Sequence, residues 1–167
     1  MDEAETLGLI RKEIRKSVGK RRSVILVQAG NPKRIKSLKD LAKEGTKVGI
    51  STSGCLVGVW DDVSSKAYLT DQIRKNITDF ADGCGAVMAL INQKKVDAIF
   101  GWNVFKNIWP GTSEIVELPK EIQVYRSTGV AVISYSKEVE AASRFIEYLT
   151  SKEGKKIYAE YGWIHEF

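Results

Sequence analysis

Short apolar runs bounded by turn or charged residues mark the strands that this sequence predicts. Residues 23–28 (SVILVQ) are nearly all apolar and lie between basic residues and the turn Gly30–Asn31–Pro32, which is the pattern of a strand buried on both faces. Shorter strands are expected at residues 47–50, 77–80, 96–100, 114–119 and 129–133. Strands buried on both faces occur in parallel or mixed sheets that helices cover, so we predict an α/β fold.

Apolar residues spaced three and four positions apart predict helices between these strands. Residues 2–18 carry one such stripe, formed by Leu7, Ile10, Ile14 and Val18. A short helix is expected to begin at its N-cap Ser37 and to end at Gly45. The apolar residues 86–91 predict a buried helix, and the C-terminal residues predict helices that break near Gly154.

A loop of small residues, Ser51, Thr52, Ser53 and Gly54, follows the strand at 47–50 and precedes an apolar run. A strand that enters a helix through such a loop leaves backbone N–H groups unpaired beside the positive end of the helix dipole. This arrangement favours an anion. The alternative is that Ser53 only caps the following helix.

The same order of strand, small-residue loop and helix recurs at Asp82–Gly83–Cys84–Gly85. A third strand ends at Gly101–Trp102–Asn103. Ligands of open α/β sheets bind beyond the carboxyl ends of the strands. We therefore expect the three loops to share one crevice.

The chain has 167 residues, of which 43% are hydrophobic, and this is enough for one domain or two small lobes. Its formal net charge of +5 suits an anionic ligand or a polyanion, although an excess of lysine also serves solubility. The basic cluster Lys20–Arg22 contains no aromatic residue, which argues against a nucleic-acid surface. No stretch reaches the roughly 18 apolar residues of a transmembrane helix.

The sequence offers no recognisable catalytic group. His165 is its single histidine, and we find neither a nucleophile beside a base nor a pair of carboxylates at catalytic spacing. We therefore predict a binding protein rather than an enzyme.

Three segments carry a likeness to a known family. They are VILVQAGNPKRIKSLKDLAKEGTKVGI at 24–50, VDAIFGW at 96–102 and AASRFIEYLTSKEGKKIYAEYGW at 141–163. They resemble, in this order, the crossover into the second lobe, a strand with an aromatic end and the C-terminal signature of type II periplasmic solute-binding proteins, particularly the molybdate- and tungstate-binding family. The resemblance implies mixed or parallel sheets flanked by helices, with residues 29–111 as a complete second lobe and residues 1–28 and 112–167 as a partial first lobe.

One departure from that family is large. Its members begin with a βαβα segment that builds much of the first lobe and supplies ligand-binding residues, whereas this chain starts at the helix before the crossover strand. Two explanations stay open: a fragment, or a shortened relative whose first lobe is completed by another chain. A lobe without its central strands would expose apolar surface, so we expect a homodimer or a swapped assembly.

The resemblance also implies a ligand and a partner. In this family, backbone N–H and hydroxyl groups hold an oxyanion such as molybdate or tungstate between two lobes, and an ABC permease receives it. Some archaeal relatives add carboxylates, and Asp82 lies near the corresponding loop. No cofactor and no nucleic acid are expected. Carried over by position, the ligand-binding residues of this chain are Ser51, Thr52, Ser53, Val57, Gly83, Cys84 and Trp102.

Three questions stay open at this point. Cys55 and Cys84 both lie in loops that should face the crevice, where they would form a disulfide, bind a soft metal ion or simply be small buried residues. The resemblance implies a periplasmic or extracellular protein, but the acidic N-terminus MDEAET lacks the apolar segment of a signal peptide, so a cytoplasmic location also stays open. The alternative function is a truncated ligand-sensing or regulatory domain without a transport role.

Overall fold

The computed structural model describes residues 1–165, and the chain divides into two compact units. Unit 2 comprises residues 22–125. Unit 1 comprises residues 1–21 together with the described residues from Arg126 onward. The lobe boundaries that the sequence predicts lie near residues 28 and 112. Residues 25–28 of the crossover strand pair with residues 113–116, and both segments belong to unit 2.

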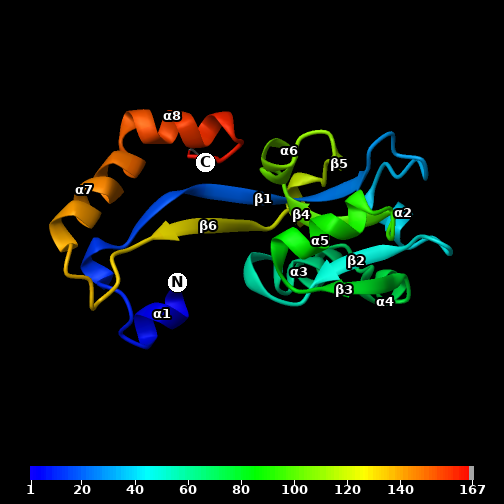
Figure 1. The fold of residues 1–167 in the computed structure, drawn as a ribbon. Coiled ribbons are helices and arrows are strands. Elements are labelled where there is room, and N and C mark those ends of the chain that lie inside the picture. Colours follow the sequence, from blue (N-terminus) through cyan, green and yellow to red (C-terminus); the bar gives the residue numbers. More distant parts are fainter. Residues whose placement is uncertain (166–167) are drawn as a thin grey trace. The chain divides into compact units, whose positions relative to one another are not determined.

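The elements alternate between strands and helices along most of the chain (Figure 1). The strands are β1 (Lys16–Gln28), β2 (Val48–Ser51), β3 (Ile77–Ala81), β4 (Ala98–Trp102), β5 (Ser113–Val116) and β6 (Tyr125–Val130). The α-helices are α1 (Asp2–Thr6), α2 (Leu38–Leu41), α3 (Val59–Lys66), α4 (Thr70–Arg74), α5 (Gly83–Asn92), α6 (Phe105–Ile108), α7 (Val139–Thr150) and α8 (Lys152–Glu160). The 3₁₀ helices are η1 (Lys12–Ile14), η2 (Gly54–Leu56) and η3 (Lys120–Ile122). Within residues 1–165, none of the helices is long and apolar enough to cross a membrane.

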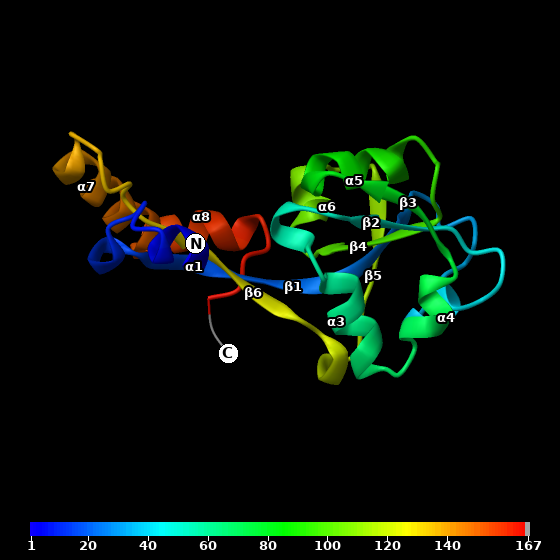
Figure 2. The ribbon, with the colours of Figure 1, turned by 90° about the horizontal axis from the view of Figure 1, so that it is seen from below.

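The sheet is mixed, with the strand order β3-β2-β4-β1-β5 and with β6 paired to β1. Strand β2 runs parallel to β3 and to β4, whereas β1 runs antiparallel to β4 and β5. In unit 2, helix α5 covers one face of the sheet, and α3 and α4 lie on the other (Figure 2). This arrangement confirms the predicted α/β class with a mixed sheet flanked by helices.

The core of unit 2 lies where the sequence is most apolar. Residues 24–27 of β1 and 98–100 of β4 are buried, and Leu26 lies opposite Ile99 across the antiparallel pair. From α5, Val87, Met88 and Ile91 pack against the sheet. The strands predicted near residues 23–28, 47–50, 77–80, 96–100 and 114–119 are confirmed. Strand β1 begins well before its predicted start, at Lys16, and the other ends shift by a few residues.

The helix predicted over residues 2–18 is wrong. Helix α1 ends at Thr6, the chain turns at Gly8 with φ +67°, and residues from Lys16 onward are extended in β1. The apolar stripe finds no core to face, since Leu7 is exposed and, of its four residues, only Val18 is buried. The helical spacing of apolar residues therefore does not determine the secondary structure of residues 2–18.

Two details of the C-terminal part also differ from expectation. The strand expected at 129–133 is β6, Tyr125–Val130, and Ile133 is exposed. The helix break lies at Ser151, whose hydroxyl accepts a hydrogen bond from the Gly154 N–H at 3.2 Å. Gly154 is therefore part of the first turn of α8, and the cap rather than the glycine separates the two helices.

Candidate functional site

The loops that follow β2 and β3 are joined by hydrogen bonds. Because the two strands are parallel, their carboxyl ends lie at the same edge of the sheet. The backbone N–H of Thr52 donates to the carbonyl of Ala81 at 2.9 Å, and the Thr52 hydroxyl donates to the same oxygen at 3.2 Å. The structure thus joins the loops after β2 and β3, and the third strand, β4, is parallel to β2 and also ends at this edge.

Two glycines allow the backbones of these loops to approach each other. Gly54 has φ +71° and Gly83 has φ +83°, a left-handed conformation that favours glycine. A methyl group on Gly54 would lie 3.9 Å from the Gly83 Cα, and one on Gly83 would lie 3.9 Å from the Ser53 hydroxyl oxygen. Peptide N–H groups from both loops therefore reach the same small region.

Helix α5 begins in this region. Its N-cap is Asp82, which makes no side-chain hydrogen bond to the first turn, and that turn contains no acidic residue. The first N–H groups of a helix point along its axis and carry the positive end of its dipole. The loop after β2, by contrast, enters only the short 3₁₀ helix η2, and α3 begins later, at Val59. Ser53, at the N-cap of η2, also makes no side-chain cap hydrogen bond.

The predicted hydroxyl donors are engaged within the protein. Ser51 is buried and donates to the carbonyl of Ser53 at 3.0 Å. The hydroxyl of Ser53 donates to the Asp82 carboxylate, and that of Thr52 donates to Ala81, as described above. A hydroxyl has a single proton to donate. In this arrangement an incoming anion would therefore meet backbone N–H groups first, and the hydroxyls would have to rotate to donate to it.

Three other predicted residues have different surroundings. Trp102 is fully buried, and its indole N–H donates to the Cys55 sulfur at 3.3 Å, so it supports the η2 loop from inside. Val57 is exposed, and its N–H donates to the Gly54 carbonyl at 3.5 Å. Cys84 lies in the first turn of α5 and is half-buried. Sequence reasoning found these positions but not the link from Trp102 to Cys55, which depends on side-chain orientation.

The charged residues of the two loops and their flanking strands are negative. No lysine or arginine occurs between Val48 and Trp60 or between Ile77 and Gln93, where the charged residues are Asp79 and Asp82. A ligand at this site would be held by N–H groups and the helix dipole of α5 rather than by a cation from these segments. Sequence reasoning placed Asp82 near the loop but did not predict its hydrogen bond with Ser53, although both residues directly follow neighbouring parallel strands.

The structure gives no support to a metal ion at the cysteines. Within residues 1–165, no group of three or more histidine, cysteine, aspartate or glutamate side chains is arranged to hold one. The two cysteines are half-buried thiols on the two joined loops.

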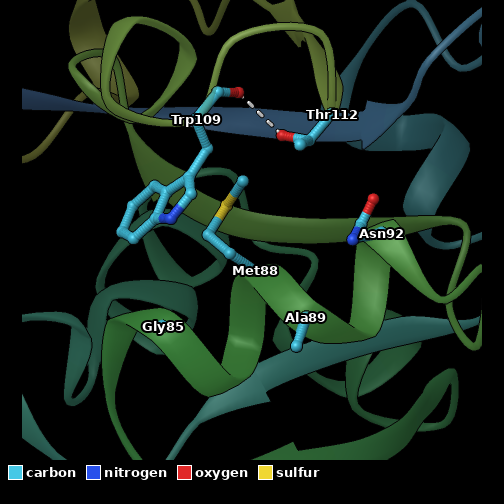
Figure 3. Close-up of a pocket in the computed structure, with 6 residues that line it drawn as sticks. All are labelled: Gly85, Met88, Ala89, Asn92, Trp109 and Thr112. Atoms are coloured by element: carbon cyan, nitrogen blue, oxygen red, sulfur yellow. Dashed lines mark hydrogen bonds between the residues drawn. The ribbon is translucent and has the colours of Figure 1, made fainter.

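A separate hollow of about 170 Å³ lies beside α5 (Figure 3). Trp109 and Met88 give it an apolar wall, and the Thr112 hydroxyl donates to the Trp109 carbonyl at 2.8 Å. None of the predicted ligand residues lines it. Its lining residues are Gly85, Met88, Ala89, Asn92, Trp109 and Thr112.

Comparison with known proteins places the chain in a family. Residues 1–164 match the family described as bacterial extracellular solute-binding protein. No curated protein sequence matches the chain significantly. Among solved structures, PEB3 of Campylobacter jejuni with bound L-phospholactate is similar, with 28% identity and a TM-score of 0.86 over 98% of this chain and 73% of that one.

Two further structures show the same fold. The substrate-binding domain of a molybdenum ABC transporter from Clostridium difficile is 24% identical, with a TM-score of 0.73 over 99% of this chain and 73% of that one. The periplasmic molybdate-binding protein of Azotobacter vinelandii is 15% identical, with a TM-score of 0.78 over 99% of this chain and 74% of that one. These likenesses confirm the predicted type II periplasmic-binding-protein fold.

Proposed function

Since this chain belongs to the bacterial extracellular solute-binding proteins, we propose that it binds a tetrahedral oxyanion where the loops after β2 and β3 meet. The protein is a solute-binding component of the ABC-transporter type. The observation that carries the proposal is the close approach of Gly54 and Gly83 at the N-terminus of α5. An anion there would accept N–H groups from both loops and gain from the helix dipole.

The ligands named for similar structures support this class of ligand. The named solutes are L-phospholactate for PEB3, sulfate for a Mycobacterium tuberculosis protein and molybdate for the A. vinelandii protein. A phosphoryl group, sulfate and molybdate share four oxygens around one centre. Molybdate and tungstate are the specific ligands that the sequence suggested, and phosphate groups join them here.

Each predicted residue has a proposed role. The N–H groups of Ser53, Gly83 and Cys84 bind the anion, and the hydroxyls of Thr52 and Ser53 rotate toward it. The buried Ser51 and Trp102 hold the η2 loop in place through their bonds to Ser53 and Cys55. Val57 closes the exposed side of the loop.

The partners follow from the same membership. We propose that an ABC permease receives the solute and that the protein works outside the cytoplasm, as the family description states for its members. The family membership favours this role over a regulatory sensing domain.

A homodimer or swapped assembly is the second part of the proposal. Most of the exposed large apolar side chains among the described residues lie in unit 1, and apolar surface of this kind marks association sites where it is contiguous. We propose that another copy of the chain covers it. These side chains are Met1, Leu7, Leu9, Ile133, Tyr135, Phe145, Tyr148, Ile157 and Tyr161.

Calorimetric titration of the 167-residue chain with molybdate, tungstate, sulfate and phosphate tests the proposal. Light scattering at the same protein concentration fixes the oligomeric state. Saturable heat with at least one of these anions, in a dimeric sample, is the expected result. No heat with any of the four would remove the oxyanion-binding function.

Two glycine variants locate the site. Gly83→Ala places an alanine in a left-handed backbone conformation at the N-terminus of α5. Gly111→Ala does the same at φ +77°, in a turn where the added methyl group meets open space. Each should lower the free energy of unfolding by about 1 kcal/mol. Only Gly83→Ala should weaken the binding of the anion. Equal affinities in the two variants would place the anion elsewhere.

A further inference from the structure

We propose that unit 2 carries a second binding surface, a basic edge that holds the protein on a membrane of anionic phospholipids. The basic edge consists of the segments 29–47, 71–76 and 92–97, which precede β2, β3 and β4 along the chain. It is separate from the proposed oxyanion site, and it rests on the proposed function only because a solute-binding protein that serves a permease works beside a membrane.

The fold brings the three segments to one edge of the sheet. Strand β2 is parallel to β3 and β4, so their amino ends lie together, and the antiparallel β1 ends at the same edge. The Asp97 N–H donates to the Lys47 carbonyl at 2.8 Å. The Val48 N–H donates to the Asn76 carbonyl at 2.8 Å, and the Asn76 side chain donates to the Lys43 carbonyl at 2.8 Å. In Figures 1 and 2, the loop from β1 to β2 and helix α4 both lie at this end of unit 2.

The excess positive charge of the chain is concentrated on the basic edge. Of the 26 basic and 21 acidic residues of the chain, ten and four lie in these segments, which gives a net charge of +6. The other 16 and 17 lie in the rest of the chain, which has a net charge of −1. All ten basic residues of the edge are exposed. The edge therefore accounts for the whole positive excess and presents it to solvent.

The composition of the basic edge fits lipid headgroups better than a nucleic acid. The three segments, which the structure describes throughout, contain no aromatic residue that could stack on a base. Eight of the ten basic residues are lysines. A lysine ammonium is a point charge on a flexible stem, which suits mobile phosphates, whereas bidentate binding of fixed phosphates favours arginine.

The basic edge is suited to adsorption rather than insertion. None of the large apolar side chains that the described residues expose lies in the three segments. Its attraction to the membrane would therefore be electrostatic and would fall off within a Debye length. Each lysine or arginine near an anionic membrane strengthens binding about fivefold.

The place of the basic edge in unit 2 leaves the candidate anion site accessible. The loops at 51–54 and 82–85 follow the carboxyl ends of β2 and β3, whereas the basic edge precedes the amino ends of these strands. Adsorption through the edge would thus keep the protein at the membrane while its solute-binding loops stay open to the medium.

Co-sedimentation of the full 167-residue chain with lipid vesicles tests this inference. Vesicles with about one third phosphatidylglycerol in phosphatidylcholine are compared with vesicles of phosphatidylcholine alone, at about 0.05 M and about 0.3 M salt. The chain should bind the anionic vesicles at the lower salt and leave them at the higher salt, because salt screens the attraction. It should not bind the neutral vesicles.

Two matched pairs of substitutions locate the surface. Lys47→Gln together with Lys95→Gln removes two charges from the basic edge and should weaken vesicle binding about twentyfold to thirtyfold. Lys106→Gln together with Lys120→Gln removes the same charge from exposed residues of unit 2 outside the edge, and should weaken binding less than about twofold. Both variants should keep the native affinity for the oxyanion.

The outcomes separate the basic edge from the oxyanion site. Equal weakening by the two pairs, or no binding to the anionic vesicles at the lower salt, would overturn the membrane role of the edge. Tighter binding to a short DNA duplex than to the vesicles at the same salt would overturn it in favour of a nucleic acid. A chain that binds no oxyanion in calorimetry but still adsorbs through the basic edge would refute the proposed function alone.

Discussion

Unit 2 and unit 1 differ in how far they bury their apolar side chains. In unit 2, β1, β2 and β4 contribute consecutive buried residues, with Leu26 and Ile99 fully buried at its centre. In unit 1, the buried large apolar side chains within the described residues are Val18, Val132 and Ile146. On the same unit, Leu7 is 63% exposed, Phe145 is 60% exposed and Tyr135 is 74% exposed.

This difference indicates which unit stabilises the isolated chain. Burial of apolar surface contributes about 25 cal/mol per Å², so the stability of the isolated chain comes mainly from unit 2. Unit 1 has helices and strands whose apolar side chains are largely exposed. We therefore expect unit 2 to hold its fold and its loops by itself, and unit 1 to depend on association.

The largest effect should come from the core of unit 2. Leu26→Ala removes a fully buried side chain that lies opposite Ile99 and Ile115 in adjacent strands, and should lower the free energy of unfolding by about 3 kcal/mol. Phe145→Ala, in unit 1, should change it by less than about 0.5 kcal/mol in the monomer. Urea unfolding at low protein concentration measures both. Similar losses in the two variants would mean that unit 1 has a core of its own.

A smaller effect should appear in the association of unit 1. Phe145→Ser places a hydroxyl in the exposed apolar face and should weaken the proposed dimer by about 1.5–2 kcal/mol, or roughly tenfold to thirtyfold. Sedimentation over a range of concentrations gives the dimer dissociation constant. Tyr68→Ser is the control, because Tyr68 is 91% exposed but lies in unit 2. Equal weakening by both variants, or a native chain that stays monomeric, would contradict the proposed assembly.

A still smaller effect should come from the charge at the start of α2. The pKa of the Asp40 carboxyl is held well below its usual range because Lys43 donates to it at 2.6 Å and the Lys36 N–H donates at 2.9 Å. A carboxyl with a lowered folded-state pKa stabilises above its unfolded value of about 3.9, and this contribution is lost as the pH falls further. Asp40→Asn should therefore lower the free energy of unfolding by about 1 kcal/mol at neutral pH, and by progressively less below about pH 4.

The matching charge in unit 1 should matter less. The pKa of Asp2 is lowered by a hydrogen bond from Arg15, but the Asp2 side chain is 91% exposed. Exposed ion pairs contribute little to stability. Asp2→Asn should leave thermal unfolding unchanged at neutral pH, and a loss as large as that of Asp40→Asn would show that unit 1 is held by its charges rather than by association.

The same contrast explains how much of the fold the sequence predicted. In unit 2, apolar runs such as residues 23–28 coincide with strands. The strand there is buried on both faces, and a continuous apolar run is the pattern of such a strand. In unit 1, residues 2–18 have helical spacing, but the chain is extended from Lys16 because pairing with other strands outweighs local periodicity. Local patterns predict structure well only where the core they imply is present.

The candidate site was predictable in outline for a related reason. Strand ends and small residues locate the loops at Ser51–Gly54 and Asp82–Gly85, because parallel neighbours bring their carboxyl ends together. The partners of each hydroxyl and the burial of Trp102 were not predictable, because they depend on rotamers and on strand register. The bond between Ser53 and Asp82 belongs to this second group.

Crystals of the chain grown with arsenate provide the most direct test of the oxyanion site. Arsenate keeps the tetrahedral shape and the proton of phosphate, and its arsenic atom scatters anomalously. The account predicts an anomalous peak against the N–H groups of residues 53–55 and 83–85. A peak elsewhere on the molecule, or none at saturating arsenate, would contradict it.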